Sequence, residues 1–398
     1  MRIVHVADFV TDVLGYQELQ LARWNARHGH DVVVLTSCLN PPHSDYGAAF
    51  EPLLGPRRLT VGDEILSGVE VRRLEVAVER RTRVILRGLH RELRRFGPDA
   101  ILVHGSMSPT TLACARYARR SAVPLFADNH MEFSVQDKSP VGRVAYAGMR
   151  TIMRQYLAPR VEGFFGVAED CSRFLVEALA APEQKVALLP LGVDTELFRY
   201  SSDAAQRRRQ EVGIPVGARV VMQTGKLSAD KDPITLARAV SGLMLENPDV
   251  WTVFLGNGPE QTIEELRAAI GPSGQERLRV LPMVPFLDLP EYLSMADVVV
   301  YPGGTSLSSL EAASCERAVI MNDLPNSRWR SGLGLGRTFR THNPDSLRRE
   351  VGSILADREG REKMGRSARK LVEDQFSYDR VAALLEEQMA AAVLGTHR

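Results

Sequence analysis

A loop in the second half of the chain carries cations at a spacing suited to binding an anion. It runs from Gln223 to Pro233, follows an apolar run, and places Lys226 and Lys231 after the hinge residue Gly225. Two such lysines can converge on one anion, and fixed cations stabilise the charge that builds on a departing phosphate. A solvated loop with two surface lysines is the alternative interpretation of this spacing.

A second loop, from Tyr301 to Ala313, joins an apolar run to a helix pattern. Its glycines let the backbone approach a ligand, and the free amides at a helix N-terminus attract anions. Glu311, in the first turns of that helix, can accept hydrogen bonds from ribose hydroxyls. A plain helix cap with a glutamate that satisfies the helix dipole is the alternative. The residues expected to meet the ligand here are Gly304, Thr305, Ser306 and Leu307.

Two further loops follow apolar runs in the same half of the chain. One contains Gly256, and the other contains Val284 and Pro285, whose backbone could meet a nucleobase edge. Each is a weak signal by itself, and a plain turn explains it equally well.

Short apolar runs alternate with helix-period segments along the whole chain, which predicts parallel sheets covered by helices. The pattern restarts after residues 194–217, a polar, arginine-rich stretch where we expect the domain break. In open parallel sheets, ligands bind outside the carboxyl ends of the strands, where all these loops lie. The predicted strands are Ile3–Val6, Val32–Leu35, Val69–Val71, Ala100–Val103, Leu125–Ala127, Phe164–Val167, Val186–Leu189, Val220–Gln223, Thr252–Leu255, Leu278–Leu281, Val298–Tyr301 and Ala318–Met321. The predicted helices include Glu18–Arg27, Val84–Phe96, Thr110–Arg120, Ile234–Glu246 and a last one from Tyr378 to about Ala392.

The bulk composition bounds the class of protein. The 398 residues suit two domains, and 44% apolar and 25% charged residues are ordinary for a globular protein. The net charge of +1 gives no reason to expect a nucleic acid partner. Four scattered cysteines without a CxxC pair argue against a disulfide framework or a zinc site and favour a reducing cytosol. No run approaches the ~20 apolar residues of a membrane span, and the N-terminal run reads as a strand rather than a secretory signal.

Taken together, the second half resembles the donor-binding domain of glycosyltransferase family 4, a family of retaining GT-B enzymes. The matching stretches are Gly225-Lys226 with Lys231, Gly256–Pro259, Pro285 with Ala296–Val298, Pro302–Ala313 and Phe376–Tyr378. The first half matches more loosely, at Gly15 with Glu18, Gly29–Val32, Pro98–Ile101 with His104, and Leu191–Asp194 with Phe198. The resemblance implies an α/β GT-B fold of two Rossmann-like doubly wound domains facing across a cleft. Residues 1–198 would form the acceptor-binding domain, joined by the C-terminal helix 378–398 packing back toward it, and residues 199–377 the donor-binding domain.

The resemblance also assigns roles. Lys226 and Lys231 would grip the diphosphate, Glu311 would hold the ribose, and Gly15 would allow close approach after the first strand. A histidine in the first domain touches the donor sugar in this family, and His130 fits that role best, with His104 as the alternative. A lone histidine is more often structural.

This sequence departs from the family pattern around the sugar. Gly303 stands eight positions before Glu311, where the family has an acidic residue that binds sugar hydroxyls. Pro325–Trp329 replaces a Gly-Gly-x-x-Glu loop, and Leu191 replaces an asparagine. One hypothesis is that the donor sugar lacks a hydroxyl, or carries a substituent, where the missing carboxylate would bind.

The predicted activity is therefore transfer of a sugar from a UDP- or GDP-linked donor to a sugar or lipid-linked acceptor, in the assembly of cell-surface polysaccharide, lipopolysaccharide or glycolipid. We expect no metal and no further cofactor, because the only Asp-x-Asp, Asp230-Lys231-Asp232, has a lysine at its centre. A non-catalytic nucleotide-sugar-binding subunit and a GT-B epimerase remain alternatives. A nicotinamide oxidoreductase is disfavoured, because the first strand lacks a Gly-x-Gly-x-x-Gly loop.

One segment bears on membrane contact. From Arg72 to Arg95 there are nine arginines and three acidic residues, and the predicted helix Val84–Phe96 has apolar residues at helical spacing. Such a helix can lie on anionic lipid, so peripheral contact through Arg80–Arg95 is one hypothesis for an otherwise cytoplasmic protein. A solvated outer face is the alternative.

Overall fold

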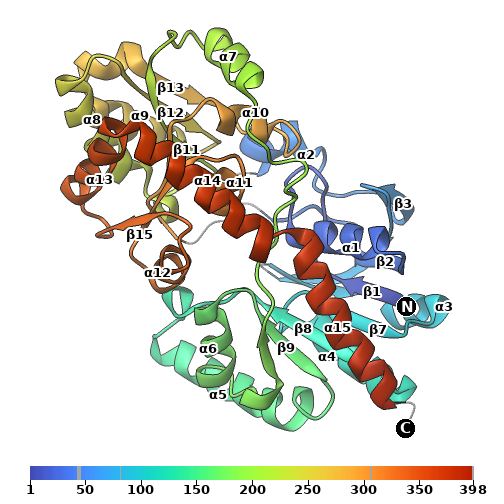
Figure 1. Ribbon diagram of the computed structural model, residues 1–398. Coiled ribbons are helices and arrows are strands. Elements are labelled where there is room, and N and C mark those ends of the chain that lie inside the picture. Colours follow the sequence, from blue (N-terminus) through green and yellow to red (C-terminus); the bar gives the residue numbers. More distant parts are fainter. Residues whose placement is uncertain (43–45, 81, 305–306, 397–398) are drawn as a thin grey trace. The chain divides into compact units, whose positions relative to one another are not determined.

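The computed structural model describes residues 1–42, 46–80, 82–304 and 307–396. The chain forms two compact units, one of residues Met1–Leu191 with Tyr378–Arg398 and one of residues Gly192–Ser377 (Figure 1). We call them unit 1 and unit 2 and treat each by itself.

Unit 1 is built on an eight-stranded sheet with the order β10-β9-β8-β7-β1-β2-β4-β3. All neighbouring strands are parallel except β3 and β4, and β5 and β6 form a separate antiparallel hairpin. Strand order reverses between β1 and β7, so this pair is the topological switch point of the sheet. The strands are β1 (Arg2–Val6), β2 (Asp31–Ser37), β3 (Gly62–Leu66), β4 (Val69–Leu74), β5 (Val76–Arg80), β6 (Arg83–Leu86), β7 (Ala100–Val103), β8 (Leu125–Asn129), β9 (Gly163–Gly166) and β10 (Val186–Leu188).

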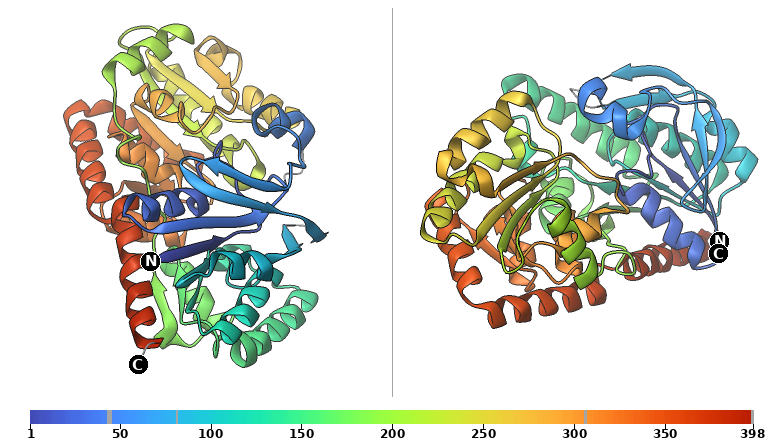
Figure 2. Two further views of the ribbon diagram at one scale, coloured as in Figure 1. Left: turned by 90° about the vertical axis from the view of Figure 1, so that its right-hand side faces the viewer. Right: turned by 90° about the horizontal axis from the view of Figure 1, so that it is seen from above.

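Helices cover both faces of this sheet because its strands are apolar on both sides. Val4 and Val6 face a core shared with α3, α4 and α6, whereas Ile3 faces a core shared with α1 and α15. The last helix buries residues at helical spacing, including Tyr378, Val381 and Leu385, beside α1 (Figure 2). The helices are α1 (Gln17–Arg27), α2 (Glu51–Leu54), α3 (Leu89–Phe96), α4 (Pro109–Ser121), α5 (Pro140–Ile152), α6 (Glu169–Glu177) and α15 (Tyr378–Thr396).

Unit 2 has a six-stranded parallel sheet with the order β13-β12-β11-β14-β15-β16. Its switch point lies between β11 and β14, the two strands that precede the lysine loop and the glycine loop. The strands are β11 (Arg219–Thr224), β12 (Val250–Leu255), β13 (Leu278–Leu281), β14 (Val298–Tyr301), β15 (Ala318–Asn322) and β16 (Arg337–Phe339). The helices are α7 (Ser202–Glu211), α8 (Pro233–Glu246), α9 (Glu260–Ile270), α10 (Leu289–Ser294), α11 (Ser308–Ser314), α12 (Pro325–Gly332), α13 (Pro344–Ala356) and α14 (Arg358–Gln375).

The boundary between the units lies earlier than the expected 198/199. Residues 192–198 belong to unit 2, because the Val193 amide donates to the carbonyl of Phe376 at 2.7 Å and Phe198 is fully buried beside Phe286. The Phe198 carbonyl also accepts from Ser314 Oγ at 2.7 Å. The expected break at residues 194–217 therefore lies at the start of unit 2, just after the boundary between Leu191 and Gly192.

The predicted helix Val84–Phe96 is wrong over its first half. Residues Arg83–Leu86 form β6, in which Ile85 pairs with Val78 of β5, and the helix begins only at Leu89. Gly88 has a φ of 77°, a left-handed conformation that separates the strand from the helix.

Candidate functional site

In unit 2 the predicted loops meet at the carboxyl ends of β11, β12, β13 and β14. The Gly225 amide donates to the carbonyl of Leu255 at 3.0 Å, and the Gly256 amide donates to that of Leu281 at 2.9 Å. Gly225 has a φ of 109°, and a Cβ on Gly256 would lie 1.7 Å from the Gly225 carbonyl oxygen. Both positions therefore require glycine.

The loop that contains Val284 and Pro285 is tied to its neighbour by a side chain. The Met283 amide donates to Asn257 Oδ1 at 2.9 Å, and the Leu227 amide donates to the carbonyl of Asn257 at 2.8 Å. Asn257 thus links the loops after β11, β12 and β13. This linkage fixes the backbones of the three loops at the carboxyl ends of the strands.

Lys226 and Lys231 lie on the loop after β11, with the short turn η5 (Ala229–Lys231) between them. Both side chains are partly buried, and burial lowers the pKa of Lys226, with Lys231 adding to the effect and Asp230 opposing it. Lys231 Nζ lies 3.7 Å from Asp230 Oδ2. The other oxygen of this carboxylate, Oδ1, accepts a hydrogen bond from Ser228 Oγ at 2.6 Å. The charge of Lys231 disfavours the charged form of Lys226, and an anion bound beside them would stabilise that form.

The glycine loop after β14 packs directly on the lysine loop. The Gly303 amide donates to the Lys231 carbonyl and the Gly304 amide to the Asp230 carbonyl, both at 3.1 Å. A Cβ on Gly303 would lie 2.0 Å from the Asp230 carbonyl oxygen, so no side chain fits there in this conformation. The amide of Gly304 is therefore engaged by the carbonyl of Asp230. Thr305 and Ser306 lie outside the described residues.

Glu311 occupies the first turns of α11, which begins directly after Leu307. The side chain is only 4% exposed, and burial raises its pKa to about 7 against a hydrogen bond from Ser308. Tyr301 at the end of β14 joins this helix to β11, because its hydroxyl donates to the carbonyl of Ser308 at 2.6 Å and lies 3.1 Å from Thr224 Oγ1. A buried carboxyl group at a switch point is the kind of perturbed group that marks a functional site.

Arg330 is a buried cation that the sequence patterns did not indicate. It lies on α12, which replaces the expected Gly-Gly-x-x-Glu loop, and is 1% exposed. Its guanidinium donates to Ser309 Oγ at 2.8 Å and so braces the start of α11.

In unit 1 the residues proposed from the sequence follow three strands. Gly15, with a φ of 63°, lies between β1 and α1, and His104 and His130 follow β7 and β8. His104 Nδ1 lies 2.5 Å from Asp128 Oδ2, and His130 Nε2 lies 3.7 Å from the other oxygen of Asp128. The structure thus brings both candidate histidines onto one buried carboxylate.

Asp8 follows β1 at the switch point of unit 1 and had no assigned role. Thr110 Oγ1 donates to its Oδ1 at 2.5 Å, and Arg83 lies 3.7 Å from its Oδ2. Burial raises the pKa of Asp8 even though Thr110 and Arg83 oppose it. Its place directly after an apolar strand was the signal in the sequence that could have indicated it.

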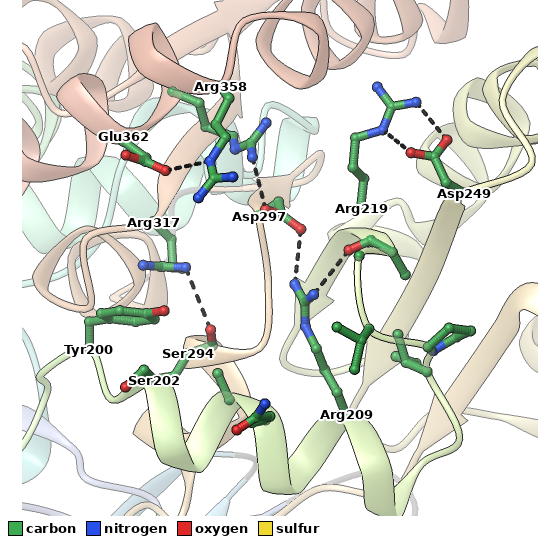
Figure 3. A pocket seen from close by; sticks show the side chains of 18 of the residues that line it. Tyr200, Ser202, Arg209, Arg219, Asp249, Ser294, Asp297, Arg317, Arg358 and Glu362 are labelled. Atoms are coloured by element: carbon green, nitrogen blue, oxygen red, sulfur yellow. Dashed lines mark hydrogen bonds and ion pairs between the residues drawn. The ribbon is translucent and has the colours of Figure 1, made fainter.

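A hollow of about 1430 Å³ lies at the opposite, amino ends of the unit 2 strands (Figure 3). Its arginines already have partners: Arg209 and Arg361 bind Asp297 at 3.0 and 3.1 Å, and Arg317 stacks 4.2 Å from the ring centre of Tyr200. This network braces the helices of unit 2. Parallel α/β sheets bind ligands at the carboxyl ends of their strands, not at the amino ends where this hollow lies.

The arginine-rich segment is largely paired. Arg72 and Arg73 are buried against acidic residues, and Arg95 lies 3.3 Å from Glu92 and 3.4 Å from Asp63. Within the described ranges, no helix is long and apolar enough to cross a membrane, and no group of three or more acidic, histidine or cysteine side chains is arranged to hold a metal ion.

Comparison with known proteins agrees with this architecture. The model of Glycosyltransferase Family 4 matches residues 18–197, and that of Glycosyl transferases group 1 matches residues 205–371. The D-inositol 3-phosphate glycosyltransferase of Thermobispora bispora is 26% identical over 241 residues, 57% of this chain and 55% of the relative. The enzyme of that name from Xylanimonas cellulosilytica is 26% identical over 400 residues, 94% of this chain and 90% of the relative. The chain thus spans little more than half the length of the first of these relatives.

A solved structure shares the whole fold. Anabaena Alr3699/HepE in complex with UDP superposes with a TM-score of 0.74 at 15% identity, covering 98% of this chain and 100% of that one. Two doubly wound α/β units of this kind define the GT-B class. With the two domain models covering both units, the chain belongs to the family 4 type of GT-B glycosyltransferases.

Proposed function

We propose that the protein transfers a sugar from a nucleotide diphosphate donor to an acceptor hydroxyl, with retention of configuration at the anomeric carbon. The observation that carries this proposal is the arrangement at the switch point between β11 and β14: the loop of Lys226 and Lys231 follows β11, the loop that leads to Glu311 follows β14, and the Gly303 amide of the second loop donates to the Lys231 carbonyl of the first. Cations for a diphosphate and a carboxyl group for a ribose lie on the two loops where such sheets bind nucleotides.

The reaction breaks the bond between the anomeric carbon and the terminal phosphate oxygen and forms a bond from that carbon to the acceptor oxygen. The acceptor proton passes to the departing phosphate oxygen, so no protein base is needed, and we propose that no protein nucleophile takes part. Lys226 and Lys231 stabilise the negative charge that develops on the leaving diphosphate. The family resemblance gives His130 the contact with the donor sugar.

The solved relative supports a uridine donor. Its structures are complexes with UDP and with UDP-glucose, and we therefore favour a UDP-linked sugar, with GDP as the alternative base. For the acceptor we propose a sugar or lipid-linked hydroxyl used in cell-surface polysaccharide, lipopolysaccharide or glycolipid assembly. The four cysteines are buried, and none of them forms a disulfide bond within the part of the chain that the structure describes, which suits a cytoplasmic location.

Peripheral contact with anionic lipid through Arg80–Arg95 is a further hypothesis. Val78 and Ile85 lie opposite each other in the β5–β6 hairpin, and their side chains are 51% and 46% exposed. Arg80 and Arg87 are exposed on the same hairpin and the turn after it. Flotation with vesicles containing phosphatidylglycerol at low salt tests it, and a Val78→Ser/Ile85→Ser variant that floats as well as the parent contradicts it.

The main test compares Lys231→Ala with Lys370→Ala, an exposed lysine on α14, as the matched control. A thermal-shift panel of nucleotide sugars first selects the donor, because a bound donor stabilises the fold by mass action. With that donor, Lys231→Ala should lower the transfer rate about 100-fold or more, and Lys370→Ala should leave it unchanged.

The alternatives give different outcomes. Donor binding without any sugar transfer or donor hydrolysis by the parent protein indicates a non-catalytic subunit. Conversion of the donor into an isomeric nucleotide sugar, with no acceptor present, indicates an epimerase. Equal activity of the two lysine variants contradicts the proposed role of Lys231.

A further inference from the structure

A buried chain of hydrogen-bonded polar side chains crosses unit 1 from Glu386 of α15 to Asp128 of β8. Asn25 Nδ2 donates to Glu386 Oε1 at 2.6 Å, and Asn25 Oδ1 lies 2.9 Å from His5 Nε2. His5 Nδ1 lies 3.1 Å from His104 Nε2, and His104 Nδ1 lies 2.5 Å from Asp128 Oδ2. Asn25, His5 and Asp128 are fully buried and His104 is 8% exposed, so water does not supply alternative partners.

The direction of each hydrogen bond follows from the Glu386 end. Glu386 is a carboxylate that also contacts the ring of His28 at 3.0 Å, and it can only accept. Asn25 therefore donates its amide to Glu386 and presents its carbonyl oxygen to His5, which must donate from Nε2. Burial, with His104 adding to it, lowers the pKa of His5 to about 3. The His5 ring is thus neutral, and its Nδ1 can only accept.

His104 must then donate from both of its nitrogens. Its Nε2 donates to His5, and its Nδ1 faces Asp128, whose other oxygen accepts the Gly105 amide at 2.8 Å. Burial opposes ionisation of Asp128, but His104 and His130 hold the pKa of this carboxyl well below its usual range. A histidine that donates from both ring nitrogens is an imidazolium. His104 and Asp128 therefore form a buried ion pair.

His130 is the third group on this carboxylate. Its Nε2 lies 3.7 Å from Asp128 Oδ1, and its side chain is 42% exposed at the end of β8. Burial lowers the pKa of His130, but Asp128, with Glu18 of α1 adding to it, raises it above the ordinary value. Asp170 of α6 accepts a hydrogen bond from the Phe133 amide at 3.2 Å, and it is not among the acids that shift the pKa of His130.

We propose that Asp128 is a positioning residue for His130. His104 is an imidazolium that holds Asp128 in place, and the hydrogen-bonded chain of His5, Asn25 and Glu386 fixes His104. Asp128 keeps a proton on Nε2 of His130 and so leaves Nδ1 as the nitrogen that meets a ligand. A neutral ring then accepts from a sugar hydroxyl at Nδ1, and a charged ring donates. The use of His130 on a donor sugar rests on the proposed function, whereas the protonation states do not.

The test is nitrogen NMR of the full chain labelled with ¹⁵N-histidine, without any substrate. At pH 8, His104 should show two protonated nitrogens and His5 only a protonated Nε2. A singly protonated His104 at this pH overturns the proposal. Because no substrate is present, the result is independent of whether the protein transfers sugar, and the transfer assay alone decides that question.

Two variants move the pKa of His130 in opposite directions. Asp128→Asn removes the carboxylate and should lower it by about one to three pH units. His104→Gln removes the competing cation and should raise it. A loosened structure would instead bring both variants toward the ordinary histidine value. His90, whose Nε2 lies 2.8 Å from the Ala113 carbonyl, is the internal control. The rise expected for His104→Gln is the decisive result, because a loosened structure would lower the His130 pKa in that variant. If His104→Gln does not fold, the protonation of His104 and His5 in the parent decides instead, and an unchanged His130 pKa in a folded variant overturns the proposal.

Discussion

The buried carboxyl group of Glu311 makes the stability of unit 2 depend on pH. Burial raises its pKa from 4.5 to about 7, so the folded state holds the proton more tightly than the unfolded state does. The stability contributed by this proton is fully present below pH 4.5 and is lost as the pH rises through 7. At about 1.4 kcal/mol per pKa unit, the ionised carboxylate costs roughly 3 kcal/mol at pH 8.

Glu311→Gln replaces the acid with a neutral side chain of the same shape and should remove this cost. We expect the variant to unfold at a temperature roughly 6–12 °C above the parent at pH 8. At pH 4 the two proteins should unfold at nearly the same temperature, because Glu311 is then protonated in the folded state and mostly protonated in the unfolded state. The matched control is Glu264→Gln, an exposed position on α9 of the same unit, which should change little at either pH.

The same substitution should weaken nucleotide binding. A carboxylate accepts ribose hydroxyls more strongly than an amide does, so Glu311→Gln should lower UDP affinity about tenfold or more at pH 8. Differential scanning calorimetry and isothermal titration calorimetry measure the two effects. A variant that is less stable than the parent at pH 8, or a stability gap of equal size at both pH values, refutes the reasoning.

Four substitutions at three positions test the packing that holds the site. Gly256→Ala should lower the unfolding temperature by an amount equivalent to about 1–3 kcal/mol or more, because its Cβ would lie 1.7 Å from the Gly225 carbonyl oxygen; an unchanged melting curve would show that this contact yields freely. Gly303→Ala and Gly303→Asp should both destabilise, because the clash with Asp230 begins at Cβ; a stable Asp variant with raised transfer activity would restore the hypothesis of a missing sugar contact. Phe198→Ala should cost about 3–5 kcal/mol in thermal unfolding, and a neutral result would place residues 192–198 outside the core of unit 2.

The central parallel strands could be predicted because they are apolar runs buried on both faces. The elements that were missed lack this signal. β3 contains Asp63 and Glu64 and lies at a sheet edge, and β5 is mostly exposed. In β6 the alternation of buried Val84 and exposed Ile85 was assigned to a helix, because the two periods differ little over four residues.

The candidate site also contains residues that the sequence indicates and contacts that it does not. Lys226 and Lys231 could be found because both lie on one loop after a strand, so local spacing carries the information. The pair of His104 with Asp128 joins residues 24 apart, and the pair of His5 with His104 joins residues 99 apart. Such contacts depend on strand order, which no local pattern specifies.

Gly303 combines a signal in the local sequence with contacts that only the folded structure reveals. The family places a sugar-binding carboxylate there, but in this chain the amides of Gly303 and Gly304 hold the carbonyls of Lys231 and Asp230. The absence of a side chain at position 303 thus lets the loop after β14 pack against the lysine loop. We expect the nucleotide diphosphate to supply most of the binding energy, so UDP and UDP-glucose should bind within about tenfold of each other in titration calorimetry. A much larger gain from the sugar would mean that other side chains replace the missing carboxylate, and the packing of Gly303 would then not explain donor recognition.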